Sequence, residues 1–238
     1  MTRPRILAVD IGGSAVKAMV FAADGKPLTE RARLHTPDPA TPRAVLAVIR
    51  TLARSLAPYE RVSVGFPGVV RAGVTCTAVN LHPAWEGFGL AAALRKLTGR
   101  PCRVANDADV QGMGAIKGRG VELVVTLGTG FGAALFVDGR LVPNLELGHH
   151  PFRRGETYEE QLGAAALDDI GAKRWNRRMG KALRVLERVF NYDAVYIGGG
   201  NARKLDLKLP PKTCVVSNAA GLSGGVALWR AAGTGHLR

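Results

Sequence analysis

The stretch Ile6-Leu7-Ala8-Val9-Asp10-Ile11-Gly12-Gly13-Ser14 joins an apolar run to a glycine turn. Its first four residues have the length and composition of a buried β-strand. Glycine in the turn lets backbone N–H groups approach an anion without interference from a side chain, as in phosphate-binding turns. A tight hairpin with no ligand is the alternative interpretation of the same residues.

A second strand-like run, 123–127, leads into Gly128-Thr129-Gly130-Phe131-Gly132. Each turn carries a hydroxyl residue near its tip, Ser14 in the first and Thr129 in the second. One such turn is common in proteins, but two of the same kind are harder to explain as hairpins alone. Together they predict a pair of phosphate-binding loops.

The chain has 238 residues, 47% of them hydrophobic, which suits one large domain or two small ones. Cys76, Cys102 and Cys214 form no CxxC pair, which argues against a disulfide framework or structural zinc and fits a reducing compartment. Asp10 interrupts the N-terminal apolar run too early for a signal sequence, and no stretch reaches the roughly 18 apolar residues of a membrane span. We therefore expect a soluble, cytoplasmic protein.

The formal net charge is +14, and much of it is concentrated in residues 171–212, where eleven Lys or Arg face three Asp or Glu. This density predicts a surface for a polyanion, such as nucleic acid, an acidic membrane or a phosphate polymer. A solvated helix face is the alternative. The basic residues are Lys173, Arg174, Arg177, Arg178, Lys181, Arg184, Arg188, Arg203, Lys204, Lys208 and Lys212.

Strands and helices alternate along the chain without repeats, which predicts two α/β halves with the active site between them. We expect the first domain to comprise 1–105 plus 217–238, and the second 106–216. The predicted strands are 6–9, 16–21, 28–34, 62–64, 103–105, 121–127, 132–138 and 194–197. The predicted helices are 42–58, 90–97, 107–117, 159–190 with a break near Gly171, and 221–230.

The second half of the predicted helix 159–190 is amphipathic, with its basic residues opposite an apolar face. The apolar face is expected to lie in the core and consists of Trp175, Met179, Ala182, Leu183, Leu186, Val189 and Phe190.

Asn106 and Asp107 follow a predicted strand directly and precede a predicted helix. A carboxylate at this place can accept a proton from a substrate hydroxyl, while the amide binds an adjacent hydroxyl. Both residue types are also favoured at helix N-caps, so the spacing leaves the catalytic and the capping interpretations open.

Glu146, His149, His150, Glu159 and Glu160 supply acids and imidazoles within a short polar window. Such groups suit a sugar, whose hydroxyls both donate and accept hydrogen bonds. The adjacent histidines are weak candidates for a metal site, because neighbouring side chains diverge and no third ligand is suitably spaced.

Taken together, the motifs resemble those of the ROK sugar-kinase family, and more narrowly its polyphosphate-dependent glucokinases, over nearly the whole chain. Each glycine motif by itself is weak evidence for a family, but the occurrence of all the motifs in this order along the chain is highly specific. The matching segments are Asp10–Ser14, Gly65–Gly68, Asn80–Trp85, Val104–Gln111, Thr126–Gly132, Leu145–Phe152, Tyr158–Gly163 and Ala172–Arg177.

The resemblance implies an actin-like (ribonuclease H-like) ATPase fold of two α/β domains flanking a cleft, and phosphoryl transfer to the 6-hydroxyl of glucose. Asp107 matches the general base, and Asn106, Glu146, His149 and Glu159 match sugar-binding positions. Asp10 matches a carboxylate near Mg²⁺. The phosphate-binding positions are Asp10, Gly12, Gly13, Ser14, Lys17, Gly128, Thr129 and Gly130.

Many ROK kinases bind zinc through the histidine of a Glu-x-Gly-His motif and a following Cys-x-Cys stretch. This chain has Arg153–Thr157 at that place and no cysteine nearby, so no zinc is expected. The resemblance also suggests a homodimer. Inorganic polyphosphate is the expected donor, with ATP as a further candidate. The basic residues predicted to bind the polyphosphate chain, called the basic track, are Lys173, Arg174, Arg177, Arg178, Lys181, Arg203 and Lys204.

The sequence also bears on four alternative functions. A sugar-responsive regulator would need an N-terminal helix-turn-helix, for which the first strand leaves no room. A nucleic-acid-binding protein is disfavoured by the absence of a reading motif and by 6% aromatic residues. Membrane binding is not expected. An ATP-dependent hexokinase of broader sugar range is the main alternative.

Overall fold

A computed structural model describes residues 4–78, 81–216 and 219–230. Asn80, the first residue of one family-like segment, and part of the predicted first domain (1–3, 217–218 and 231–238) lie outside this range. The chain forms two compact units, 1–114 with 221–238, and 115–220. They are called unit 1 and unit 2 below, and each is described by itself.

Unit 1 is built on a five-stranded sheet with the order β3-β2-β1-β4-β7. The strand β1 pairs antiparallel with β2 and parallel with β4, which in turn runs parallel to β7. A short hairpin of β5 and β6 follows β4. The strands are β1 (Ile6–Ile11), β2 (Ala15–Phe21), β3 (Ala32–His35), β4 (Arg61–Phe66), β5 (Val70–Arg71), β6 (Val74–Thr75) and β7 (Cys102–Asn106).

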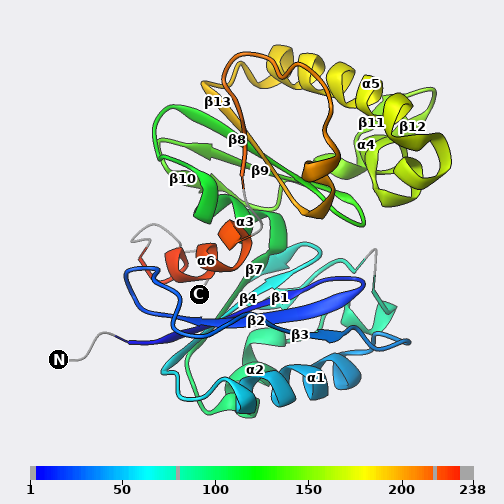
Figure 1. The fold of residues 1–238 in the computed structure, drawn as a ribbon. Helices are drawn as coiled ribbons and strands as arrows, with labels where there is room; N and C mark the ends of the chain where they lie inside the picture. Colours follow the sequence, from blue (N-terminus) through cyan, green and yellow to red (C-terminus); the bar gives the residue numbers. More distant parts are fainter. Residues whose placement is uncertain (1–3, 79–80, 217–218, 231–238) are drawn as a thin grey trace. The chain divides into compact units, whose positions relative to one another are not determined.

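Helices cover both faces of this sheet, with α1 and α2 on one face and α6 on the other (Figure 1). The alternation of side chains in β1 accounts for both layers. Leu7 and Val9 belong to the core on the α1–α2 side, whereas Ile6 and Ala8 pack with α6. The helices of unit 1 are α1 (Pro42–Ser55), η1 (Pro83–Trp85), α2 (Leu90–Thr98), α3 (Asp107–Ala115) and α6 (Ala219–Ala227).

Unit 2 repeats the same sheet topology, in the order β10-β9-β8-β13-β14. In both five-stranded sheets, the strands counted along the chain within that sheet lie side by side in the order third, second, first, fourth and fifth. The strands are β8 (Val121–Leu127), β9 (Phe131–Val137), β10 (Arg140–Val142), β13 (Ala194–Gly198) and β14 (Thr213–Val215). Each glycine turn therefore occupies the equivalent position, the connection between the first and second strands.

The helix α5 (Ala164–Phe190) crosses one face of the second sheet (Figure 1). Its residues Trp175, Met179 and Leu183 pack with strand residues such as Leu123 and Val125. The remaining elements of unit 2 are η2 (Leu147–His149), β11 (Pro151–Arg153), β12 (Glu156–Thr157), α4 (Tyr158–Leu162) and η3 (Gly200–Lys204).

Three differences from the sequence prediction have physical causes. The predicted strand 28–34 is reduced to β3, because Val20 N donates to the side-chain oxygen of Thr29 at 3.0 Å and not to a backbone oxygen of this segment. An additional break that was not predicted lies at Gly163, whose extended backbone (φ −66°, ψ 176°) separates α4 from α5. The break that was predicted near Gly171 is confirmed, because this residue has a non-helical φ of 73°. Val189 lies in the last turn of α5 and is 64% exposed, so its predicted place in the core is wrong.

The boundary between the units also differs from the prediction, because α3 belongs to unit 1. A Cβ on Gly224 would lie 1.7 Å from the carbonyl oxygen of Val110, which shows how closely α6 and α3 approach. Val110 also packs with Ala105 and Leu228. The helix ends at Ala115, before the predicted residue 117, because the Glu122 carboxylate accepts hydrogen bonds from the backbone N–H groups of the following turn.

Candidate functional site

The first group of site residues lies at the carboxyl edge of the unit 1 sheet. Three parallel neighbours end together there, with Asp10 opposite Gly65 and Gly65 opposite Ala105. Because parallel strands of an α/β sheet direct the following loops to one edge, ligands commonly bind at this place. The sheet register thus brings Asp10, Gly65 and the Asn106–Asp107 pair to one edge.

Asn106 is 7% exposed and caps α3, which confirms the capping interpretation for this residue. Its Oδ1 accepts hydrogen bonds from Ala108 N at 2.8 Å and Asp109 N at 3.2 Å. Its Nδ2 donates to the carbonyl oxygen of Gly68 at 3.2 Å. These bonds tie the start of α3 to the loop that follows β4.

Asp107 is the first residue of α3 and is partly exposed. Its Oδ1 accepts a hydrogen bond from Ala108 N at 2.8 Å. A Cβ on Gly65 would lie 3.2 Å from the Cα of Asp107, so the absence of a side chain at Gly65 permits this close approach. No role was predicted for Gly65 itself, although it begins one of the family-like segments.

The first glycine turn is the tip of the β1–β2 hairpin, and Gly13 and Ser14 are exposed at this tip. The Gly12 N–H donates to Ala15 O at 3.1 Å and is used by the turn itself. Lys17 Nζ donates to Asp10 Oδ2 at 3.0 Å. The residues expected to bind a metal and phosphate thus form an ion pair across the hairpin.

The second glycine turn is the tip of the β8–β9 hairpin in unit 2, with Thr129 exposed. Its carbonyl groups are fixed by the elements that follow later in the chain. Ala164 N, at the start of α5, donates to Thr129 O at 3.0 Å, and Asn201 Nδ2 donates to Gly128 O at 3.0 Å. The turn is therefore held from two sides.

Glu159 contacts this turn through its carboxylate. Phe131 N donates to Glu159 Oε2 at 3.3 Å, and a Cβ on Gly130 would lie 2.1 Å from the same oxygen. Gly148 makes a similar close approach, because its Cβ would lie 2.3 Å from Phe131 O. Neither of these two close contacts was predicted from the sequence, although Gly148 belongs to a family-like segment.

Glu146 and His149 form a pair beside Glu159. His149 Nε2 lies 3.4 Å from Glu146 Oε2. Burial raises the pKa of Glu146; the nearby His149 opposes this shift, and the negative charge of Glu159 adds to it. Three of the four expected sugar-binding residues are therefore neighbours within unit 2, while the fourth, Asn106, is in unit 1.

The predicted basic residues of α5 are exposed or partly exposed, opposite the buried face. Arg203 and Lys204 lie in η3 and are also exposed. Asn176, which is 6% exposed, connects the two segments. It donates to Ala172 O at 2.9 Å and Lys204 O at 3.0 Å, and accepts from Asp206 N at 2.7 Å.

A further glycine turn, Gly198–Gly200, lies at the end of β13, and the structure gives a reason for its composition. Gly199 has a φ of 89°, and a Cβ there would lie 2.3 Å from the carbonyl oxygen of Leu127. This combination of a positive φ and a close backbone contact requires glycine. The turn therefore packs directly against the end of β8.

Within the described ranges, no group of three or more His, Cys, Asp and Glu side chains is arranged to bind a metal ion. No helix in this part of the chain is long and apolar enough to cross a membrane.

Residues 6–165 match the ROK family. The polyphosphate glucokinase of Mycobacterium leprae is 32% identical over 241 residues, with 94% of this chain and 74% of that protein covered. The crystal structure of an inorganic polyphosphate/ATP-glucomannokinase from Arthrobacter sp. strain KM has a TM-score of 0.87 and 33% identity, with 95% and 99% of the two chains covered.

A ROK family glucokinase from Streptomyces griseus, solved with glucose and AMPPNP, has a TM-score of 0.81 at 20% identity and supports the fold alone, with 94% and 98% of the two chains covered. These likenesses confirm the predicted α/β fold of the actin-like type. The family match over residues 6–165 and the relatives aligned over nearly the whole chain show that this chain belongs to the ROK family.

Proposed function

We propose that the protein transfers a phosphoryl group from inorganic polyphosphate to the 6-hydroxyl of glucose. The observation that carries this proposal is the similarity, over 94% of the chain, to a polyphosphate glucokinase. The exposed basic face of α5 supports the same donor, since a row of cations beyond a triphosphate pocket suits a polymer with about one negative charge per phosphate.

Asp107 is the proposed general base. It accepts the proton of the 6-hydroxyl while this oxygen forms a bond to the terminal phosphorus, and the bond from that phosphorus to the bridging oxygen breaks. The products are glucose 6-phosphate and a polyphosphate shorter by one unit. Asn106, Glu146, His149 and Glu159 are the proposed sugar ligands.

The donor phosphates are proposed to bind at both glycine turns, at Gly12, Gly13, Ser14 and Lys17 and at Gly128, Thr129 and Gly130. Asp10 is the proposed carboxylate for Mg²⁺, which is commonly held by one or two carboxylates together with substrate phosphates. Its carboxylate oxygens suit this hard cation, and the bound ion would offset negative charge on the transferred group. Lys17, already paired with Asp10, adds a cation to the same hairpin.

We further propose a homodimer in the cytoplasm that needs no zinc and binds neither nucleic acid nor membranes. The lack of cysteine near His149 supports the expectation that the protein binds no zinc. The similarity to a polyphosphate/ATP-glucomannokinase supports ATP as a second donor and mannose as a second acceptor.

The proposed donor predicts a difference between two activities measured with Mg²⁺ at matched phosphoryl concentration. Glucose 6-phosphate should form faster with long-chain polyphosphate than with ATP. The KM for polyphosphate should rise steeply with salt, because cation–phosphate contacts release counterions, while the KM for glucose should stay nearly constant. Activity with ATP alone would favour the alternative, an ATP-dependent hexokinase. A salt-independent polyphosphate KM would contradict the basic track.

Asn176 should position the basic residues of η3 for donor binding. Asn176→Ala removes the side chain that holds Lys204 and Asp206 against α5. We expect the KM for polyphosphate to rise about three- to tenfold, since each lost hydrogen bond is worth roughly 0.5–1.5 kcal/mol. The KM for glucose should not change. A parallel rise in the KM for ATP and glucose would indicate general damage to unit 2 instead.

A further inference from the structure

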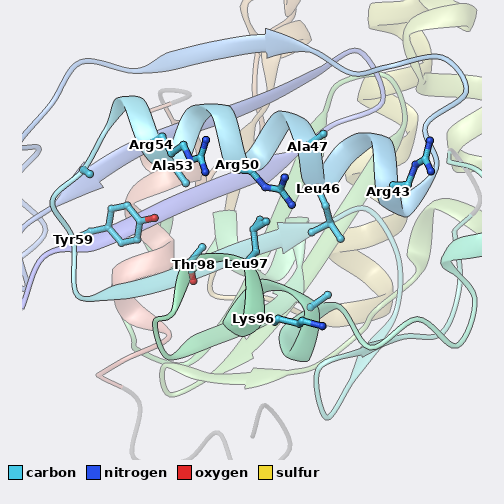
Figure 2. Close-up of a pocket in the computed structure, with 12 residues that line it drawn as sticks. Arg43, Leu46, Ala47, Arg50, Ala53, Arg54, Tyr59, Lys96, Leu97 and Thr98 are labelled. Atoms are coloured by element: carbon cyan, nitrogen blue, oxygen red, sulfur yellow. The ribbon is translucent and has the colours of Figure 1, made fainter.

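A second basic surface lies on unit 1, in a groove between α1 and α2 that the proposed reaction does not use. Figure 2 shows arginines spaced along α1, with Lys96 and Leu97 on α2 across the groove. Its volume is about 860 Å³, much more than a single phosphate ion fills. The cations that line it are Arg43, Arg50, Arg54 and Lys96, and no acidic residue lines it.

The three arginines of α1 form a line along the helix. Their spacing of seven and four residues places them within about 40° of one another around the axis, over a length of about 16 Å. All three side chains, and that of Lys96, are exposed. This arrangement suits an extended ligand rather than a compact one.

The cations of the groove have no partner within the described part of the chain, since none of the four makes a side-chain hydrogen bond or ion pair there. Glu60, the first acidic residue after α1, is bound to Arg5 at 2.7 Å. Residues 42–58 and 90–101 contain no Asp or Glu at all. Their basic residues are Arg43, Arg50, Arg54, Arg95, Lys96 and Arg100.

Four of the residues that line the groove are alanines, Ala47, Ala53, Ala57 and Ala93. Leu46 and Leu97 are partly buried and already pack against the core of unit 1. A helix that docks in a groove needs pockets for large apolar anchors, which alanine methyl groups do not form. The groove therefore favours a linear polyanion over an acidic amphipathic protein segment.

We propose that this groove, called the α1–α2 groove, is a second binding site for inorganic polyphosphate, separate from the basic track of unit 2. The inference rests on the proposed function for the choice of polyanion. Each bound phosphate releases counterions, so the site adds affinity for long chains. It leaves ATP and glucose unaffected, because neither offers an extended row of phosphates.

The test compares two variants of the full chain that lose the same charge. Arg50→Gln/Arg54→Gln removes two cations of the groove, and Arg33→Gln/Arg71→Gln removes two exposed arginines elsewhere in unit 1. Binding of fluorescently end-labelled long-chain polyphosphate is measured by anisotropy over a range of salt concentrations, and tripolyphosphate and poly-glutamate are compared with it as ligands. Glucose phosphorylation with ATP is measured in parallel.

For the groove variant we expect the Kd for long polyphosphate to rise about three- to tenfold at low salt. The slope of log K against log salt should fall in magnitude by about 1.4, the loss of two contacts to a flexible polyanion. Affinity for tripolyphosphate, and KM for ATP and glucose, should match wild type. The control variant should change the Kd by less than twofold.

An equal loss of affinity in both variants would overturn the proposal, because net charge alone would then explain the binding. Unchanged polyphosphate binding with reduced binding of poly-glutamate would also overturn it, in favour of an acidic polypeptide. Should the enzyme transfer no phosphoryl group from polyphosphate, the proposed function fails. The binding comparison still decides the role of the groove, since it does not depend on turnover.

Discussion

Asp107→Asn is expected to lower kcat by about 10²- to 10⁴-fold, the usual contribution of a general base, while the protein stays folded. The amide has nearly the same shape as the carboxylate, and its oxygen can still accept the hydrogen bond from Ala108 N. It cannot take the proton of the sugar hydroxyl. The measurement is kcat at saturating glucose and polyphosphate, together with the Tm.

The change removes a negative charge from the first turn of α3, which should alter the free energy of unfolding by no more than about 1 kcal/mol. Asp24→Asn is the matched control. This residue lies in the turn between β2 and β3, where its oxygen accepts from Lys26 N, as an amide oxygen also can. A rate for Asp107→Asn close to that of the control would remove Asp107 from the role of base.

Gly130→Ala should lower kcat/KM for glucose by about 10- to 100-fold, as expected for the loss of a hydrogen bond to a charged group. The added Cβ would lie 2.1 Å from Glu159 Oε2, so the carboxylate has to move. Because this carboxylate is the far end of a flexible side chain, the protein can accommodate the methyl group with little loss of stability. The effect falls on the proposed sugar ligand rather than on the core.

The same turn offers a control for this variant. A Cβ on Gly128 meets no atom within 4 Å, so Gly128→Ala adds a methyl group without displacing Glu159. The kcat/KM for glucose at saturating polyphosphate and the Tm are measured for both variants, and for Glu159→Gln, which changes the charge without a steric effect. If Gly130→Ala and Gly128→Ala have the same kcat/KM for glucose, the contact between Gly130 and Glu159 has no part in sugar binding.

Much of the fold could be predicted from local pattern. The apolar runs at β1 and β8, the cap at Thr41 and the positive φ of Gly171 all depend on residues close in the chain. The break at Gly163 escaped prediction because part of its cause is distant in sequence. A Cβ there would lie 2.8 Å from Glu159 O, one turn earlier, and also 2.9 Å from Thr129 O, in the hairpin of β8 and β9, which accepts a hydrogen bond from Ala164 N.

The candidate site likewise combines features that the local sequence predicts with contacts that depend on distant parts of the chain. The residue types of Asn106, Asp107, Glu146 and Glu159 indicated sugar chemistry, and their order along the chain indicated the family. Their hydrogen bonds and close contacts were not visible, because each joins segments that pair only when the sheets form. Examples are the close approach of Gly65 to the Cα of Asp107 and the hydrogen bond that Asn176 donates to Lys204 O. In addition, both glycine turns are tips of antiparallel hairpins, as the hairpin interpretation predicted, while phosphate binding at these turns stays a proposal.

The sequence by itself determined most of the strands and helices, the chemical classes of the site residues and the basic character of α5, since these follow from composition and short-range periodicity. Only the tertiary structure decided which residues share an edge or a groove. Two sheets of equivalent strand order place the glycine turns at equivalent connections. The packing of α1 against α2 aligns cations that lie far apart in the chain, from Arg43 to Lys96. Such contacts depend on long-range strand pairing and helix packing, which local sequence does not encode.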